Sequence, residues 1–189
     1  MWHIEIAGTG SPAIRETIIH LTGIFAVTLA AVLGIGAAAA AQPAKSLREQ
    51  LVGTWSFVIA EITAADGKKT LPFGDKPKGL LIFSEDGHFS QVHISSGLPR
   101  IQSNNRLAGT DADNRAIVHG TLALFGTYTV DEAKRTLTFN ITASTFPNQE
   151  GTSQTRTIDK LTADEFRNTN PAASRDGPAV AANYYTRAK

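Results

Sequence analysis

Apolar and polar residues alternate in short runs along most of the chain after residue 50. The clearest case is the stretch 79–95, in which two alternating runs flank a turn that contains Asp86-Gly87. Glycine adopts a positive φ at little cost, so this sequence is typical of a tight connection between antiparallel strands. The stretch therefore predicts a β-hairpin with strands at about 79–84 and 88–95.

Similar runs predict further strands, and one segment predicts a helix. The expected strands lie at about 53–62, 125–130, 136–144, 152–159, 165–169 and 180–187. Thr110, followed by Asp111 and Asp113, is typical of a helix start, because a hydroxyl caps free N–H groups and acids suit the helix dipole. The chain lacks the alternation of strands and helices that produces parallel sheets. Because an antiparallel sheet must protect its edges, we expect an all-β fold: one eight-stranded antiparallel β-barrel with one short helix.

The segment 96–109 is long and polar, with Gly97, Pro99 and Asn104-Asn105. Loops of this length are uncommon in compact domains unless they cover or form a binding site. We therefore expect this loop to cover the open end of the barrel.

The first 41 residues have a different character. Arg15 precedes an apolar run at 21–35, and Ala39-Ala40-Ala41 before Gln42 is typical of a signal-peptide cleavage site. The run 18–41 is also long enough to span a bilayer as an uncleaved anchor. We thus expect a signal peptide or N-terminal anchor at 1–41, a tether at 42–50 and the barrel domain at 51–189. Either leader predicts a secreted or periplasmic protein, or one anchored at its N-terminus with the domain outside the cytoplasm.

Composition removes several classes of function. The chain has no cysteine, which excludes disulfides, thiol nucleophiles and cysteine-ligated metals. Its 18 basic and 17 acidic residues are interspersed, so no basic stripe indicates a nucleic-acid partner. Phosphate-loop and dinucleotide fingerprints are absent from the barrel region, and His88, His93 and His119 do not have metal-ligand spacing. We expect no cofactor, no metal and no membrane insertion of the barrel domain, and we leave the oligomeric state open.

A series of short motifs carries a resemblance to a known family. Gly53-Thr54-Trp55 resembles the G-x-W motif of lipocalins. A longer series resembles the bacterial and fungal lipocalin-like domain family over about 51–187; it comprises LPFGDKPKG at 71–79, Asp86-Gly87, FGTY at 125–128, Pro147-Asn148, Arg156 and Tyr185-Thr186-Arg187. The resemblance implies a lipocalin-like β-barrel with a ligand cavity, and it implies no particular reaction. That family often carries a histidine in the strand that here reads Thr138-Phe139-Asn140.

The resemblance also implies a structural role for its motif residues. In such barrels the tryptophan of the first strand closes the bottom and packs against an arginine of the last strand. Trp55 and Arg187 match these positions, so we expect a cation–π contact between them. The remaining structural motif residues are Gly53, Gly79, Asp86 and Gly87.

Strand alternation assigns candidate residues to the barrel interior. With a turn at 85–87, Phe83 faces Phe89, and Gln91 and His93 follow on the same face. This face is either the lumen or the outer surface, and His93 lies either in a cavity or at its wet rim. Arg156 shares a face with Ile158; its partner is either a ligand anion or an acid such as Asp159 or Glu61, unless it is solvated. The candidate ligand-binding residues are Arg156, His93, Gln91, Phe83, Phe89, Phe139 and Tyr128, and we assign no catalytic residue.

Three functions remain open. The first is an exported binding protein for a small hydrophobic molecule, with or without an anionic group. The second is a cofactor-free isomerase, cyclase or hydrolase that uses His93 and Arg156 in the lumen. The third is a filled barrel that acts as a protein-interaction module. The pattern favours binding over catalysis, because neither a nucleophile elbow nor a metal site is evident.

Overall fold

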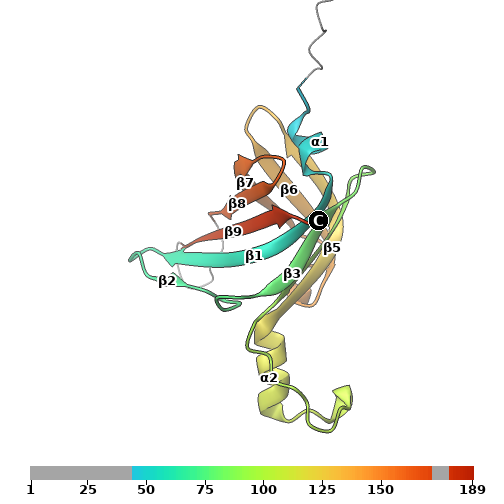
Figure 1. Ribbon diagram of the computed structural model, residues 1–189, viewed down its shortest axis with the longest axis vertical. Helices are drawn as coiled ribbons and strands as arrows, with labels where there is room; N and C mark the ends of the chain where they lie inside the picture. Colours follow the sequence, from blue (N-terminus) through green and yellow to red (C-terminus); the bar gives the residue numbers. More distant parts are fainter. Residues whose placement is uncertain (1–43, 172–178) are drawn as a thin grey trace, which may run out of the picture. The chain divides into compact units, whose positions relative to one another are not determined.

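The computed structural model describes residues 44–171 and 179–189, and its strands form one antiparallel sheet (Figure 1). The strands are β1 (Gly53–Ala64), β2 (Lys69–Thr70), β3 (Lys78–Phe83), β4 (His88–Ile94), β5 (Thr121–Asp131), β6 (Thr136–Ser144), β7 (Ser153–Leu161), β8 (Glu165–Asn170) and β9 (Ala179–Arg187). The helical elements are α1 (Leu47–Leu51), η1 (Arg106–Ala108), α2 (Asp111–Gly120) and η2 (Pro147–Gln149). None of the helices in these two ranges is long and apolar enough to cross a membrane.

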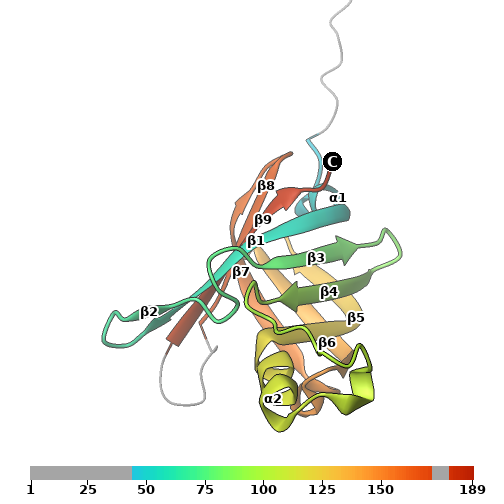
Figure 2. The ribbon, with the colours of Figure 1, turned by 60° about the horizontal axis from the view of Figure 1, so that its bottom comes forward.

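The sheet closes because β1 pairs with β9 as well as with β3. The β1–β9 register runs from Trp55 opposite Arg187 to Ala64 opposite Ala179. The strand β2 only extends the far end of β1, where Ile62 lies opposite Thr70 (Figure 2). The remaining eight strands form a closed barrel, which confirms the predicted fold.

The β3–β4 hairpin has the predicted register. Phe83 lies opposite Phe89 and Leu81 opposite Gln91, and all four side chains are buried. Gly87 has a φ of 92°, the left-handed conformation that favours glycine. The face of the hairpin that carries Phe83 and Phe89 therefore points into the barrel. Of the two alternatives left open by the sequence, lumen and outer surface, the lumen is the one observed.

A β-bulge changes the inward face of β1 partway along the strand. Trp55 and Phe57 point inward, the register against β9 shifts between Phe57 and Ile59, and Ala60 is buried after it. An extra residue on one strand reverses the alternation and increases the local twist. The bulge was not predicted from the sequence, which indicated only a strand at about 53–62.

One end of the barrel is closed by α1. Ser46 caps this helical turn in a capping box with Glu49, and Leu47 and Leu51 are buried in the core. Glu132, just beyond β5, accepts hydrogen bonds from the N–H groups of Leu47 (2.9 Å) and Arg48 (3.1 Å). The segment 42–50, expected as a tether, thus contributes Leu47 to the core, and the expected barrel domain begins with Leu51.

The expected contact between Trp55 and Arg187 lies at this closed end. The guanidinium carbon of Arg187 is 3.7 Å from the centre of the Trp55 ring. Its nitrogens donate to the carbonyls of Gln50 (2.7 Å), Val52 (2.8 Å) and Ala163 (3.1 Å). Gly53 has a φ of 121°, a backbone conformation that favours glycine, and a Cβ atom there would lie 2.9 Å from Nη1 of Arg187.

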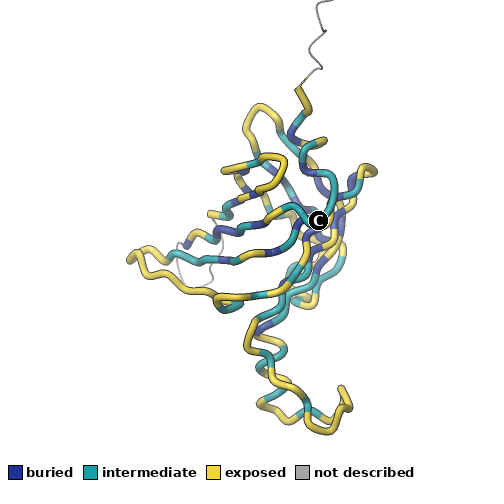
Figure 3. The backbone as a smooth tube through the Cα atoms, in the orientation of Figure 1, coloured by how far each residue is buried: buried dark blue, intermediate teal, exposed yellow. Residues whose placement is uncertain are grey.

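The opposite end carries α2 and the loop before it. Thr110 caps α2 in a capping box with Asp113, as the sequence predicts. Figure 3 shows that this helix and its preceding loop are largely exposed, whereas the barrel strands bury alternate residues. Leu107 in η1 and Val118 in α2 are 85% and 70% exposed.

Candidate functional site: a pocket at the open end of the barrel

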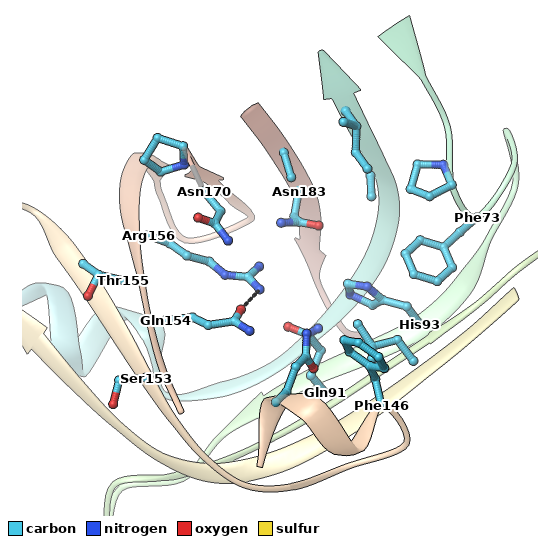
Figure 4. A pocket seen from close by; sticks show the side chains of 17 residues that line it. Phe73, Gln91, His93, Phe146, Ser153, Gln154, Thr155, Arg156, Asn170 and Asn183 are labelled. Atoms are coloured by element: carbon cyan, nitrogen blue, oxygen red, sulfur yellow. Dashed lines mark hydrogen bonds between the residues drawn. The ribbon is translucent and has the colours of Figure 1, made fainter. Parts of the chain in front are cut away.

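A pocket of about 640 Å³ occupies the end of the barrel opposite α1 (Figure 4). Gln91 and His93 of β4, Arg156 of β7 and Asn183 of β9 line it. Its rim includes Phe73, from the connection between β2 and β3. The barrel is therefore hollow at this end, which contradicts the hypothesis of a completely filled barrel.

Arg156 is buried in the pocket wall, with 8% of its surface exposed. Its Nη1 donates to Oδ1 of Asn168 (3.3 Å), its Nη2 donates to Oε1 of Gln154 (3.2 Å), and its guanidinium carbon lies 5.0 Å from the ring centre of Phe139. Burial lowers the pKa of Arg156, but an arginine keeps its charge at neutral pH. The inward orientation expected from its phase with Ile158 is correct.

No carboxylate in the described part of the chain forms an ion pair with Arg156. The two acids considered from the sequence have other partners: Asp159 accepts a hydrogen bond from Thr169 (3.2 Å), and Glu61 pairs with Lys69 (2.9 Å). The interpretations of Arg156 as a salt-bridge residue or as a solvated residue are therefore wrong. For Asp159 the reason is strand phase, because Arg156 and Ile158 of β7 are buried whereas Thr157 and Asp159 are on the exposed face.

Amide side chains surround the guanidinium. Asn183 donates from Nδ2 to Oδ1 of Asn168 (3.3 Å), and both residues are buried. Three buried polar atoms have no hydrogen-bond partner among the described residues: Arg156 Nε, Asn168 Nδ2 and Gln91 Oε1. Each such atom costs about 1–3 kcal/mol of desolvation. Hydrogen-bonding capacity in and behind the pocket wall is thus left unused by the described residues.

His93 belongs to an aromatic cluster on another side of the pocket. Its ring stacks on Phe57 with centres 3.7 Å apart and meets Phe73 edge-on at 5.2 Å. Its Nε2 shares a 3.0 Å hydrogen bond with the hydroxyl of Tyr185. Burial, helped by the positive charge of Arg156, lowers the pKa of His93 to about 3, so the imidazole is neutral at pH 7.

The partner of His93 bears on the enzyme hypothesis. A histidine bonded to an acid would indicate a general base, because the acid stabilises the protonated ring. Here the partner is a phenol, and burial raises the pKa of Tyr185 so that it is neutral as well. The pair therefore provides hydrogen-bonding groups and shape rather than a poised acid or base.

Four of the predicted ligand-binding residues do not line this pocket. Phe83, Phe89, Phe139 and Tyr128 pack together toward the closed end; the Phe89 and Phe139 ring centres are 4.6 Å apart and those of Phe83 and Tyr128 are 4.8 Å apart. The hydroxyl of Tyr128 donates to the Ser84 carbonyl (3.0 Å). They face inward as expected, but they fill that half of the barrel, and only Phe139 touches the site, beneath Arg156.

The loop at 96–109 contributes no side chain to this pocket, although the N–H of Ser96 donates to the carbonyl of the rim residue Phe73 (3.2 Å). The Ser95 N–H donates to the Gly120 carbonyl (2.7 Å), and Asn114 donates to the Gly109 carbonyl (3.2 Å). These bonds direct the loop along α2 instead. The rim is formed by other segments, among them Phe73 and η2.

Several residues of the site were not predicted from the sequence. Asn168 and Asn183 were not singled out, and neither were Phe73 and Tyr185 as neighbours of His93. A signal was present for the asparagines, because each lies two residues from a large aromatic residue, Phe166 or Tyr185, on the same strand face. A polar residue in phase with buried aromatic residues indicates an interior polar group.

Within the described ranges, no group of three or more histidine or acidic side chains is arranged to hold a metal ion. The chemistry of the pocket therefore comes from one guanidinium, several amides and aromatic rings. An antiparallel barrel that is filled at one end and hollow at the other has the architecture of barrels that hold one small ligand.

Sequence comparison identifies the family. The chain belongs to the lipocalin-like domain family, whose sequence model matches residues 52–187. No curated protein matches the chain. Among solved structures, a redesigned beta barrel aligns with 77% of this chain and 100% of its own length, at 14% sequence identity and a TM-score of 0.40.

Proposed function

We propose that the protein binds a small hydrophobic molecule that carries an anionic group. One observation carries this proposal: Arg156 is buried in the pocket, and its partners among the described residues are amide oxygens and no carboxylate. A buried charge without a counter-charge is costly, and a ligand carboxylate supplies both the charge and a bidentate hydrogen-bond geometry. The anionic group therefore lies against Arg156.

The rest of the pocket suits the apolar part of such a molecule. Ile62, Phe73, Leu122 and Ala181 contribute apolar surface, and the volume of about 640 Å³ falls within the range of small-molecule sites. Because amide side chains contribute as well, the pocket is more polar than a cavity for a simple alkyl chain. An amphiphilic ligand with one charged end fits both kinds of surface.

Isothermal titration calorimetry with matched acids and alcohols tests the proposal. The ligands are 2-naphthoate with 2-naphthalenemethanol, and decanoate with decanol, so that the result does not depend on the shape of the apolar part. Replacing Arg156 with leucine should weaken an acid that binds by roughly 10- to 150-fold, the value of a charge-assisted hydrogen bond. The same change should leave the alcohols almost unaffected.

The variant Arg100→Leu is the matched control, because Arg100 is exposed and lies outside this pocket. It removes one positive charge and should leave the affinities of acids and alcohols unchanged. Equal losses for acids and alcohols in Arg156→Leu, or no loss for either, would show that Arg156 does not recognise an anion.

The proposed compartment lies outside the cytoplasm, with the leader either cleaved or retained as an anchor. The support is the sequence itself: an apolar run followed by Ala39-Ala40-Ala41 and Gln42, in a part of the chain outside the described residues. N-terminal sequencing of protein recovered from cells should begin near Gln42. Recovery of membrane-bound protein that retains Met1 would establish the anchor instead.

A further inference from the structure

Gln91 has surroundings that are unusual for a glutamine. It lies on β4 between Leu81 of β3 and Leu124 of β5, both of which are buried, and only 1% of its own surface is exposed. Its Oε1 atom has no hydrogen-bond partner among the described residues. A leucine or methionine would fill this position without leaving a buried polar atom unpaired.

Gln91, with this unpaired oxygen, lines the same pocket as Arg156. Figure 4 shows Gln91 between the side of the pocket that carries Arg156 and the side that carries His93. An amide oxygen accepts hydrogen bonds, whereas the guanidinium donates them, so the two groups require opposite chemistry from one ligand.

We infer that Gln91 accepts a hydrogen bond from the ligand, and that the ligand is a compact hydroxy acid built on a ring. This inference rests on the proposed function, because the carboxylate of the same molecule lies against Arg156. The hydroxyl group lies on the far side of the ring and donates to the Gln91 amide.

The shape of the pocket floor explains why the ligand is compact. Phe139 lies directly beneath Arg156, and Phe83, Phe89 and Tyr128 fill the barrel beyond it. A ligand that reaches both Arg156 and Gln91 therefore lies across the barrel, because it cannot extend toward the closed end. A rigid ring presents polar groups at two separate edges, whereas a fatty acid offers only one polar end.

Calorimetry with 2-naphthoate and its ring-hydroxylated isomers tests the inference. In the wild-type protein, at least one isomer should bind roughly fivefold to tenfold more tightly than 2-naphthoate, the value of one neutral hydrogen bond. In Gln91→Met, a substitution of similar shape, this advantage should disappear. In Arg156→Leu, all the acids should weaken, but the ratio between the best isomer and 2-naphthoate should persist.

The control is Ser90→Ala, which changes the neighbouring, exposed residue of β4 and should preserve the hydroxyl preference. If Gln91→Met does not fold, the affinities of the ligand series for the wild-type protein test the inference without it. If 2-naphthoate binds through Arg156 but no isomer gains affinity, or if Gln91→Met keeps the gain, the inference is wrong and the proposed function stands. If Arg156→Leu weakens acids and alcohols equally, the proposed function itself fails.

Discussion

His93 is a neutral side chain whose protonation opposes folding. In the barrel its pKa is about 3, mainly because of burial, whereas its ordinary value is 6.5. The unfolded chain therefore binds one more proton than the folded chain at pH values between these two. Because the unfolded state gains protons as the pH falls, acidification through this window destabilises the barrel.

Denaturant unfolding at two pH values measures this effect. Between pH 7 and pH 5.5 the free energy of unfolding should fall by about 1 kcal/mol through His93 alone, since each unit below the unfolded pKa is worth about 1.4 kcal/mol. The variant His93→Phe keeps an aromatic ring against Phe57 but cannot bind a proton. It should lose this part of the pH dependence.

The control for this comparison is His119→Ala, because His119 is exposed in α2. It should show the same pH dependence as the wild-type protein. If His93→Phe keeps the full wild-type slope between pH 7 and pH 5.5, then His93 does not titrate as its burial requires.

Trp55 and Arg187 should be energetically coupled. Trp55→Ala removes a fully buried ring and should cost about 3–5 kcal/mol of unfolding free energy. A double-mutant cycle with Arg187→Ala should give a coupling of about 0.5–2 kcal/mol, the value of a cation–π contact that is partly shielded from water. Arg187→Lys should not restore stability, since an ammonium cannot reach three carbonyls at once. Simple additivity in urea-unfolding measurements would contradict the contact.

Local sequence patterns predicted most of the elements, because alternation and turn chemistry act within a few residues. The hairpin of β3 and β4 is the best example: Gly87 determines the turn, and the turn determines that Gln91 and His93 share a face with Phe83 and Phe89. The inward position of Arg156 followed from the same alternation. These predictions needed no knowledge of distant contacts.

Features that depend on distant contacts were not predicted. The bulge in β1 follows from its pairing with β9, which starts more than a hundred residues later in the chain. The division of inward side chains between a filled end and a hollow end depends on which rings meet across the barrel, as Phe83 and Phe139 do. Strand phase gives the face of a residue but not its depth, so Phe89 was placed in the pocket together with Gln91.

The helical turn α1 buries Leu47 and Leu51 in the core, whereas the sequence predicted a tether up to residue 50. Leu51→Ala should lower the free energy of unfolding by about 2–5 kcal/mol, because a fully buried leucine leaves a cavity. Val118→Ala in the exposed helix α2 is the control and should cost less than about 0.5 kcal/mol. Equal, small costs in chemical denaturation would show that α1 does not belong to the cooperative core.

The packed core and the pocket lie at opposite ends of the barrel. Trp55, Phe83 and Leu51 fill the end that α1 closes, whereas Gln91 and Arg156 lie in the pocket at the other end. Substitutions at the closed end should therefore change unfolding more than binding. For Gln91 and Arg156 the proposed function predicts the reverse, because their unpaired buried polar atoms contribute nothing to folding.

A crystal structure of the complex with 2-naphthoate tests the central claim most directly. The ring should occupy the pocket, and a carboxylate oxygen should lie about 2.7–3.2 Å from a guanidinium nitrogen of Arg156. Asn168 and Gln154 should remain beside that guanidinium and hold it in place. A naphthoate whose carboxylate points into solvent at the rim, or one bound outside the barrel while Arg156 keeps only its amide partners, would contradict the account.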